Sequence, residues 1–225
     1  MTTIIIVAGG SGQRMNAQIP KQFILLDNKP ILMRTMEKFF HYDKSFVFIL
    51  ALPKSQIEVW KALCQTYNFQ IKHQIVEGGK TRFESVKNAI AQSTSQGLIG
   101  IHDGVRPFVS NSTISHCIIS AKKLGSGIPA VKIVDSLRKI DKNKHFPVDR
   151  ELFRSIQTPQ FFTASKIKAA YKQNYCAEFT DDASVYEKFG ETVYLVEGNR
   201  ENIKITTQTD LILAEALLKT EIKGC

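Results

Sequence analysis

A glycine-rich segment follows directly on an apolar, β-branched run at the N-terminal end of the chain. The run Ile4-Ile5-Ile6-Val7 predicts a buried parallel strand. The next residues, Ala8-Gly9-Gly10-Ser11-Gly12, have almost no side-chain bulk, and the cations Arg14 and Lys21 follow them. Glycines let backbone N–H groups approach an anion closely, and nearby cations neutralise its charge. The segment therefore predicts a turn that binds a nucleoside triphosphate. A tight turn that binds no ligand is the structural alternative.

Two other phosphate-binding motifs fit this sequence poorly. The dinucleotide fingerprint G-x-G-x-x-G would need a third glycine at Met15, which argues against a dehydrogenase. Gly79-Lys80-Thr81 resembles the end of a P-loop, but the first glycine of that motif would fall on Gln74. Neither motif is complete, so neither indicates a function for this chain.

Apolar runs and helical periodicities alternate along most of the chain. This alternation predicts an α/β fold, a three-layer, doubly wound and mostly parallel sheet in one domain over residues 1–225. Strands are expected at 46–52, 70–76, 98–102, 128–134 and 192–196. Helices are expected after Pro30, around 57–67, 83–90, 114–124, 165–175 and 180–189, and at the C-terminus after a capping box, Thr207 to Asp210.

The alternation stops at about residues 135–157. Short alternating segments flank the charged turn Asp141-Lys142-Asn143-Lys144, which predicts a protruding β-hairpin arm. A hairpin this small lacks a core of its own, so a second subunit is the simplest partner and a homodimer is expected. An unpartnered surface insertion is the alternative.

The amino-acid composition excludes fewer classes of function than the motifs do. The formal charge of +9 attracts small polyanions, but the lysines form no single basic run that would indicate nucleic acid. No apolar stretch is long enough to span a membrane. The four cysteines and five histidines are scattered, so we expect reduced thiols in a cytoplasmic protein and no metal site built by the protein alone.

Polar or glycine-rich segments follow the expected strands, where open α/β sheets place their ligands. Cations recur in these segments without a Ser/His or Cys/His pair: Arg14, Lys21, Arg106, Arg150 and Lys204. Phosphoryl or nucleotidyl transfer needs positioning and charge neutralisation with little acid–base chemistry. The pattern favours such an enzyme over the alternative of a non-catalytic basic module that binds nucleotides or RNA.

Six motifs together resemble one enzyme family. They are V-A-G-G-S-G-Q-R-M with P-K-Q, G-G-K-T-R-F-E-S-V, H-D-G-V-R-P, T-P-Q-F-F, T-D-D-A-S and N-I-K-I-T. The set is similar to the 2-C-methyl-D-erythritol 4-phosphate cytidylyltransferases of the non-mevalonate isoprenoid pathway. The resemblance implies a Rossmann-like nucleotidyltransferase fold, CTP and a sugar-alcohol phosphate as substrates, and Mg²⁺ held mainly by phosphates.

The resemblance also implies residue roles. Lys21, Arg14 and Lys204 would act on the phosphates during catalysis. CTP would be bound by Ala8, Gly9, Gly10, Ser11, Gly12, Gly79, Ser85, Asp103 and Gly104. The sugar phosphate would be bound by Asp103, Arg106, Ser136, Arg150, Thr158, Thr180 and Lys204, with Ser136 and Arg150 supplied by the arm of the partner subunit. Asp103 would also lie near Mg²⁺.

Several points stay open at this stage. H-D-G-V-R-P is also similar to the related ribitol 5-phosphate cytidylyltransferases, which share the fold. Asp103 could instead cap the element that follows it. For Asp181 and Asp182, a role at a helix N-terminus and a role in ligand binding are both compatible with the sequence.

Overall fold

The structure, a computed structural model, describes residues 1–9 and 19–223. Its parallel half is built around β1 (Thr2–Val7), in which Ile4, Ile5 and Ile6 are fully buried. β4 (Val47–Leu52) and β6 (Leu98–Asp103) pair with β1 in parallel, one on each side, and β5 (His73–Glu77) lies beyond β4. Strands covered on both faces need apolar side chains at successive positions, which explains the continuous apolar runs.

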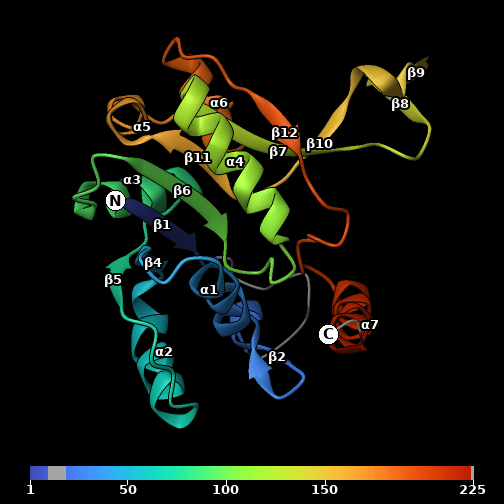
Figure 1. The fold of residues 1–225 in the computed structure, drawn as a ribbon. Helices are drawn as coiled ribbons and strands as arrows, with labels where there is room; N and C mark the ends of the chain where they lie inside the picture. The colour runs from blue at the N-terminus through green and yellow to red at the C-terminus, as the bar shows by residue number, and fades with distance from the viewer. Residues whose placement is uncertain (10–18, 224–225) are drawn as a thin grey trace.

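Helices cover both faces of this sheet (Figure 1). Ile4 and Ile6 pack with α1 (Ile31–Tyr42), α2 (Lys54–Thr66) and α4 (Asn111–Leu124). Ile5 points to the other face and packs with α3 (Arg82–Gln92), α5 (Ala164–Ala170) and α6 (Asp182–Lys188). The three-layer expectation is confirmed. None of the helices in the described part of the chain is long and apolar enough to cross a lipid bilayer.

The other half of the sheet is mixed. β11 (Gln160–Thr163) lies antiparallel between β6 and β7 (Ser126–Lys132), while β10 (Arg154–Ile156) and β12 (Leu195–Glu197) pair with the remainder of β7. The sequence analysis predicted no strand at 160–163. This strand has four residues, and Phe161 and Phe162 are buried on opposite faces, so no periodicity distinguishes it from a buried loop.

Two short elements lie beside α1, and the last helix packs on one of them. η2 (Lys21–Phe23) leads into a small hairpin of β2 (Leu25–Leu26) and β3 (Lys29–Pro30). α7 (Gln208–Lys223) packs on this hairpin through Leu211 and Ala214, in a cluster separate from the two main cores. The predicted capping box is present, because the Asp210 N–H donates to Thr207 Oγ1 and the Thr207 N–H donates to Asp210 Oδ2.

A two-stranded hairpin lies apart from the main sheet (Figure 1). It is formed by β8 (Leu137–Asp141) and β9 (Lys144–Val148), and η3 (Arg150–Leu152) follows it. Several large apolar side chains in this region are exposed: Val134, Ile140, Phe146, Leu152 and Phe153. Contact between this hairpin and a second subunit stays a prediction.

Candidate active site

A cavity of about 210 Å³ opens at the carboxyl ends of β1 and β6, beside the first turn of α3. Parallel α/β sheets place their ligands at this edge. The side chains of Lys21, Lys80, Arg82 and Lys204 bring positive charge to its wall, and Asp103 is the one carboxylate among the described residues that line it. A cavity with this excess of positive charge suits a polyanionic ligand.

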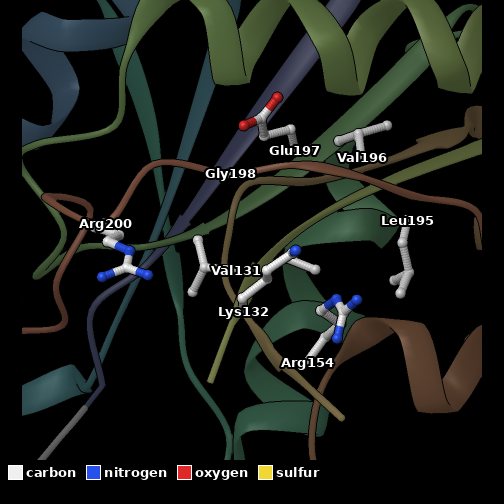
Figure 2. A pocket seen from close by; sticks show the side chains of 9 residues that line it. Val131, Lys132, Arg154, Leu195, Val196, Glu197, Gly198 and Arg200 are labelled. Atoms are coloured by element: carbon white, nitrogen blue, oxygen red, sulfur yellow. The ribbon is translucent and has the colours of Figure 1, made fainter. Parts of the chain in front are cut away.

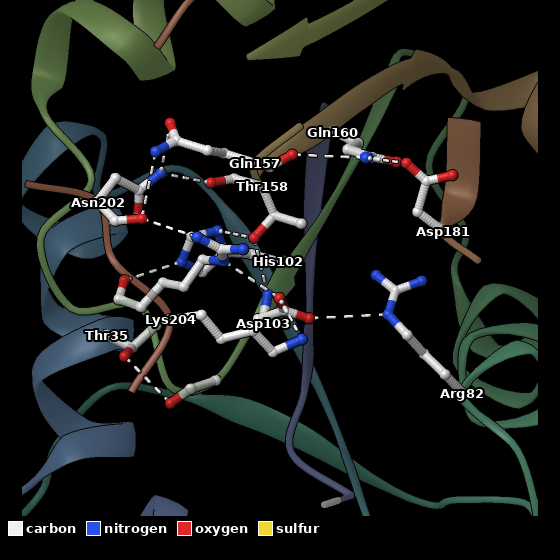
Figure 3. Close-up of polar contacts among 12 residues, drawn as sticks. Thr35, Arg82, His102, Asp103, Gln157, Thr158, Gln160, Asp181, Asn202 and Lys204 are labelled. Carbon is white, nitrogen blue, oxygen red and sulfur yellow. Dashed lines mark hydrogen bonds and ion pairs between the residues drawn. The ribbon is translucent and has the colours of Figure 1, made fainter. Parts of the chain in front are cut away.

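Asp103 ends β6 and lies at the centre of the charged side chains (Figure 3). Its Oδ2 is 3.0 Å from Lys204 Nζ and 3.2 Å from Arg106 Nε, and its Oδ1 is 3.7 Å from Arg82 Nε. Burial opposes ionisation of Asp103, but the positive charges of Arg82, Lys204 and Arg106 outweigh it and hold the pKa of this carboxyl well below its usual range. Asp103 is therefore a fixed negative charge that orients three cations.

A hydrogen bond links Gln22, the residue after Lys21, to the start of the glycine-rich segment. The side-chain amide of Gln22 donates to the Ala8 carbonyl over 2.7 Å, and Gln22 is fully buried. Lys21, in η2, lines the cavity together with Ala8 and Gly9. Gly10, Ser11, Gly12 and Arg14, the remaining predicted ligands in this segment, lie outside the described residues.

The second glycine turn is shaped by the N-terminus of α3. Ser85 Oγ accepts from the Gly79 N–H at 3.1 Å and donates to the Thr81 carbonyl at 2.9 Å. Thr81 and Glu84 form a capping box. A Cβ on Gly79 would lie 2.2 Å from Glu84 Cβ, so only glycine fits there. Gly79 and Ser85, predicted to contact the base, both line the cavity.

Two predicted ligands of the sugar phosphate lie beside Asp103. Arg106 contacts its carboxylate and also donates from Nη1 to the Asn202 carbonyl at 2.7 Å. Thr158 is buried, and its Oγ1 accepts from the Asp103 N–H at 3.1 Å and is 3.0 Å from His102 Nδ1. The hydroxyl of Thr158 is thus already engaged within the protein.

Like Arg106 and Thr158, the remaining predicted residues are not among those that line this cavity. Gly104 packs behind it, where a Cβ would lie 3.0 Å from Ala8 Cβ. Thr180 is exposed just before α6. Ser136 and Arg150 are exposed in the hairpin region, where Arg150 Nη1 donates to the Val134 carbonyl. The chain therefore brings together one part of the predicted site and leaves the hairpin residues elsewhere.

The structure identifies Arg82, which the sequence analysis did not assign to the site. Its two Nη atoms bind both oxygens of Asp182, at 2.8 and 2.6 Å, and Tyr171 donates to Asp182 at 2.6 Å. Asp182 is thereby assigned to a buried ion pair, and Asp181 caps α6 by accepting from the Ser184 N–H. The structural interpretation of both aspartates is supported, while Asp103 caps no helix. In the sequence, the only sign of a role for Arg82 in the site was its position within the motif G-G-K-T-R-F-E-S-V.

Few groups in the cavity could bind a metal ion directly. Within residues 1–9 and 19–223, no three His, Cys, Asp or Glu side chains come together to hold one. Asp103 is occupied by three cations, which makes it a poor ligand for a further cation. These residues fit a divalent ion that arrives bound to the phosphates of a substrate better than one held by the protein.

A larger groove of about 440 Å³ lies between β7, β10 and β12 (Figure 2). Apolar side chains line its floor, and its charged residues are Lys132, Arg154, Glu197 and Arg200. All four are exposed, in contrast to the buried Asp103. Exposed charges are stabilised by water, so this groove shows less preorganisation than the smaller cavity.

Known proteins resemble this chain over nearly its whole length. Residues 2–220 match the family model described as 2-C-methyl-D-erythritol 4-phosphate cytidylyltransferase. A protein of that name from Phocaeicola vulgatus is 50% identical over 215 residues, covering 96% of this chain and 98% of the relative. Another from Bacillus cereus is 35% identical and covers 99% of this chain and 100% of the relative.

Solved structures resemble the fold over nearly the whole chain. The 4-diphosphocytidyl-2C-methyl-D-erythritol synthase of Anaerococcus prevotii has a TM-score of 0.81 and 30% identity, covering 97% of this chain and 98% of its own. The 2-C-methyl-D-erythritol 4-phosphate cytidylyltransferase of Thermus thermophilus has a TM-score of 0.79 and 28% identity, covering 96% of this chain and 98% of its own.

Proposed function

The chain belongs to the 2-C-methyl-D-erythritol 4-phosphate cytidylyltransferase family, and we propose that it transfers CMP from CTP to 2-C-methyl-D-erythritol 4-phosphate in isoprenoid precursor biosynthesis. The products are 4-diphosphocytidyl-2-C-methyl-D-erythritol and pyrophosphate. One observation carries the proposal: a cavity at the carboxyl ends of β1 and β6 is lined by Lys21 and Lys204, with Asp103 orienting the second lysine.

The reaction needs no covalent intermediate on the protein. An oxygen of the acceptor's 4-phosphate attacks the α-phosphorus of CTP, the bond to the bridging oxygen breaks, and pyrophosphate leaves with its electrons. Lys21 and Lys204 neutralise the charge that develops on the α-phosphate. A divalent cation such as Mg²⁺, bound to the triphosphate, would offset charge on the leaving group.

The remaining roles follow from where each residue lies. Ala8 and Gly9, with Gly10, Ser11, Gly12 and Arg14, would bind the triphosphate, and Gly79 and Ser85 would contact the cytosine. Arg106, Thr158 and Thr180 would hold the sugar phosphate, with Thr158 acting chiefly through its bonds to Asp103 and His102. Gly104 would keep β6 close to Ala8 without touching the nucleotide.

We also propose that the enzyme is a homodimer whose hairpin completes the partner's site. Ser136 and Arg150 lie in the hairpin region and do not line the cavity of their own chain. The exposed apolar side chains in this region would be covered by a second copy. A cytoplasmic location suits the free thiols of Cys64, Cys117 and Cys176.

Pyrophosphate release tests the reaction. The wild-type chain would be assayed with Mg²⁺ and each of CTP, UTP, ATP and GTP, against methylerythritol 4-phosphate and ribitol 5-phosphate. We expect turnover chiefly with CTP and the methylerythritol substrate. Preference for ribitol 5-phosphate would favour the second candidate, which H-D-G-V-R-P suggests. Salt-sensitive RNA binding without any turnover would contradict both.

A further inference from the structure

Asn202 belongs to the polar network beside the cavity (Figure 3). It is fully buried, and its side-chain Nδ2 donates to the Thr158 carbonyl at 2.8 Å and to Gln157 Oε1 at 3.4 Å. Its own main-chain carbonyl accepts from Arg106 Nη1 at 2.7 Å. Asn202 therefore links the loop that carries Lys204 to the main chain of Thr158 and to the Arg106 guanidinium.

Through Thr158 and Asp103, these contacts connect Asn202 to the Lys204 side chain. Thr158 Oγ1 accepts from the Asp103 N–H at 3.1 Å, and the Asp103 carboxylate lies 3.0 Å from Lys204 Nζ. Lys204 follows Asn202 by two residues, and on its other side the Ile205 N–H donates to the Val105 carbonyl at 3.0 Å. The backbone on both sides of Lys204 is thus anchored, and Asn202 supplies the anchor on the N-terminal side.

The amide of Asn202 is not fully satisfied. Its orientation is set by the Thr158 carbonyl, which can only accept, and this leaves Oδ1 buried without a hydrogen-bond partner in the described part of the chain. An apolar side chain of similar size would remove this unpaired acceptor but would leave the Thr158 carbonyl without its donor. The amide at this position therefore serves to link Asn202 to the Thr158 main chain, a link that an apolar side chain could not make.

We propose that Asn202 is a positioning residue for Lys204. Its side chain fixes the position of the backbone that carries Lys204. That position keeps the Lys204 ammonium group beside Asp103 and directed into the cavity. The inference rests on the proposed nucleotidyl transfer, because the position of Lys204 matters only if that lysine stabilises the reacting phosphate. Displacing a preorganised charge by about 1 Å can lower a rate on the order of 100-fold.

The same loop contains a matched control. Asn199 Nδ2 donates to the Phe108 carbonyl at 3.0 Å, and its Oδ1 accepts from the Ser110 N–H at 3.1 Å, so it attaches the loop to the start of α4 and away from the cavity. We expect Asn202→Leu and Asn199→Leu to lower the melting temperature alike. Only Asn202→Leu should lower kcat, by about 10-fold or more, with little change in the KM for CTP.

A double-mutant cycle separates positioning from general destabilisation. In a Lys204→Ala background, Asn202→Leu should cause little further loss of kcat, whereas in a Lys21→Ala background the loss should persist. Equal losses in both backgrounds, or unchanged kcat in the single variant, would overturn the proposal. Asn202→Ala replaces Asn202→Leu if the latter does not fold. Wild-type turnover is measured first. If it is absent, the proposed function and this inference are both overturned. If it is present, a negative result with the Asn202 variants overturns this inference alone.

Discussion

At the scale of single residues, the site depends on charges that are held in place before any ligand arrives. Lys21 and Lys204 line the cavity from different elements, and Asp103 orients Lys204 at 3.0 Å. Positions fixed in this way cost no reorganisation when charge develops on the transferring phosphate. The two lysines should therefore affect turnover much more than they affect folding.

Lys21→Ala is expected to lower kcat by about 100-fold or more, because a preorganised charge of this kind contributes ~3–4 kcal/mol to transition-state stabilisation. Steady-state kinetics with CTP, together with a circular-dichroism melt, would measure both properties. Lys61→Ala is the control, since that exposed lysine forms only a surface ion pair with Glu58. Turnover close to that of the wild type would remove Lys21 from the mechanism.

His102 is a second residue whose environment has a measurable consequence. Its Nε2 is 3.0 Å from the Arg106 carbonyl, which can only accept, so Nε2 carries the proton and Nδ1 accepts from the Thr158 hydroxyl. Burial lowers the pKa of His102 from 6.5 to about 4. The folded protein therefore holds this imidazole neutral at pH values at which the unfolded chain would protonate it.

Stability should consequently fall as the pH drops from 6.5 towards about 4, because in this window the unfolded state binds a proton that the native His102 does not. Above pH 6.5 this contribution is constant. Urea unfolding across the range would measure it, and His102→Gln should show a shallower dependence than the wild type. His73, whose pKa burial also lowers, adds a contribution of the same sign that remains in the variant. An identical slope in both proteins would contradict the assignment.

At the scale of elements, one ion pair joins α3 to α6 next to the cavity. Arg82, the first residue of α3, binds both oxygens of Asp182, the first residue of α6, and it also approaches Asp103 at the end of β6. The Asp182 side chain is fully buried. Removing Asp182 takes both short hydrogen bonds from the partly buried Arg82 guanidinium and leaves it only the longer contact with Asp103.

Asp182→Ala should therefore lower the free energy of unfolding by about 3 kcal/mol, because Arg82 and the Tyr171 hydroxyl both lose their partner. Glu58→Ala is the matched control: it also breaks an ion pair, but the Glu58 side chain is 81% exposed, and a change below about 0.5 kcal/mol is expected. Urea denaturation measures both values. Equal effects for the two variants would show that burial of the pair contributes nothing.

At the scale of the whole molecule, the proposed dimer makes each site depend on two chains. The hairpin of β8 and β9 lies apart from the main sheet and carries exposed apolar side chains. Arg150 beside it does not line the cavity of its own chain. If the hairpin of one chain reaches the site of the other, Arg150→Ala should raise the KM for the sugar phosphate more than the KM for CTP.

Mixing two defective variants tests this arrangement directly, at a sugar-phosphate concentration far below the raised KM of Arg150→Ala. Lys204→Ala and Arg150→Ala homodimers are each defective in both sites, but a heterodimer formed by exchange contains one site with both defects and one with neither. Random exchange should restore about a quarter of the wild-type activity. No recovery, in a sample in which exchange is verified by mass spectrometry, would mean that Arg150 acts within its own chain.

Much of the fold follows from local sequence patterns. Continuous β-branched runs such as Ile4 to Val7 are stable only where both faces of a strand are buried, which favours a parallel sheet with helices on each side. Glycine turns and cations after such strands must then gather at one edge. Strand order and turn chemistry alone predict that Gly9, Gly79, Asp103 and Lys204 gather at this edge, and all four line one cavity.

Other features depend on residues far apart in the chain, for which no spacing rule exists. The Arg82–Asp182 pair spans 100 positions, and the bond from Arg106 to Asn202 spans 96. The sequence by itself determined the layers and the charged edge, because apolar periodicity and turn chemistry act over a few residues. Only the tertiary structure decided which carboxylate holds which cation and where β11 enters the sheet, because such contacts arise from packing between elements.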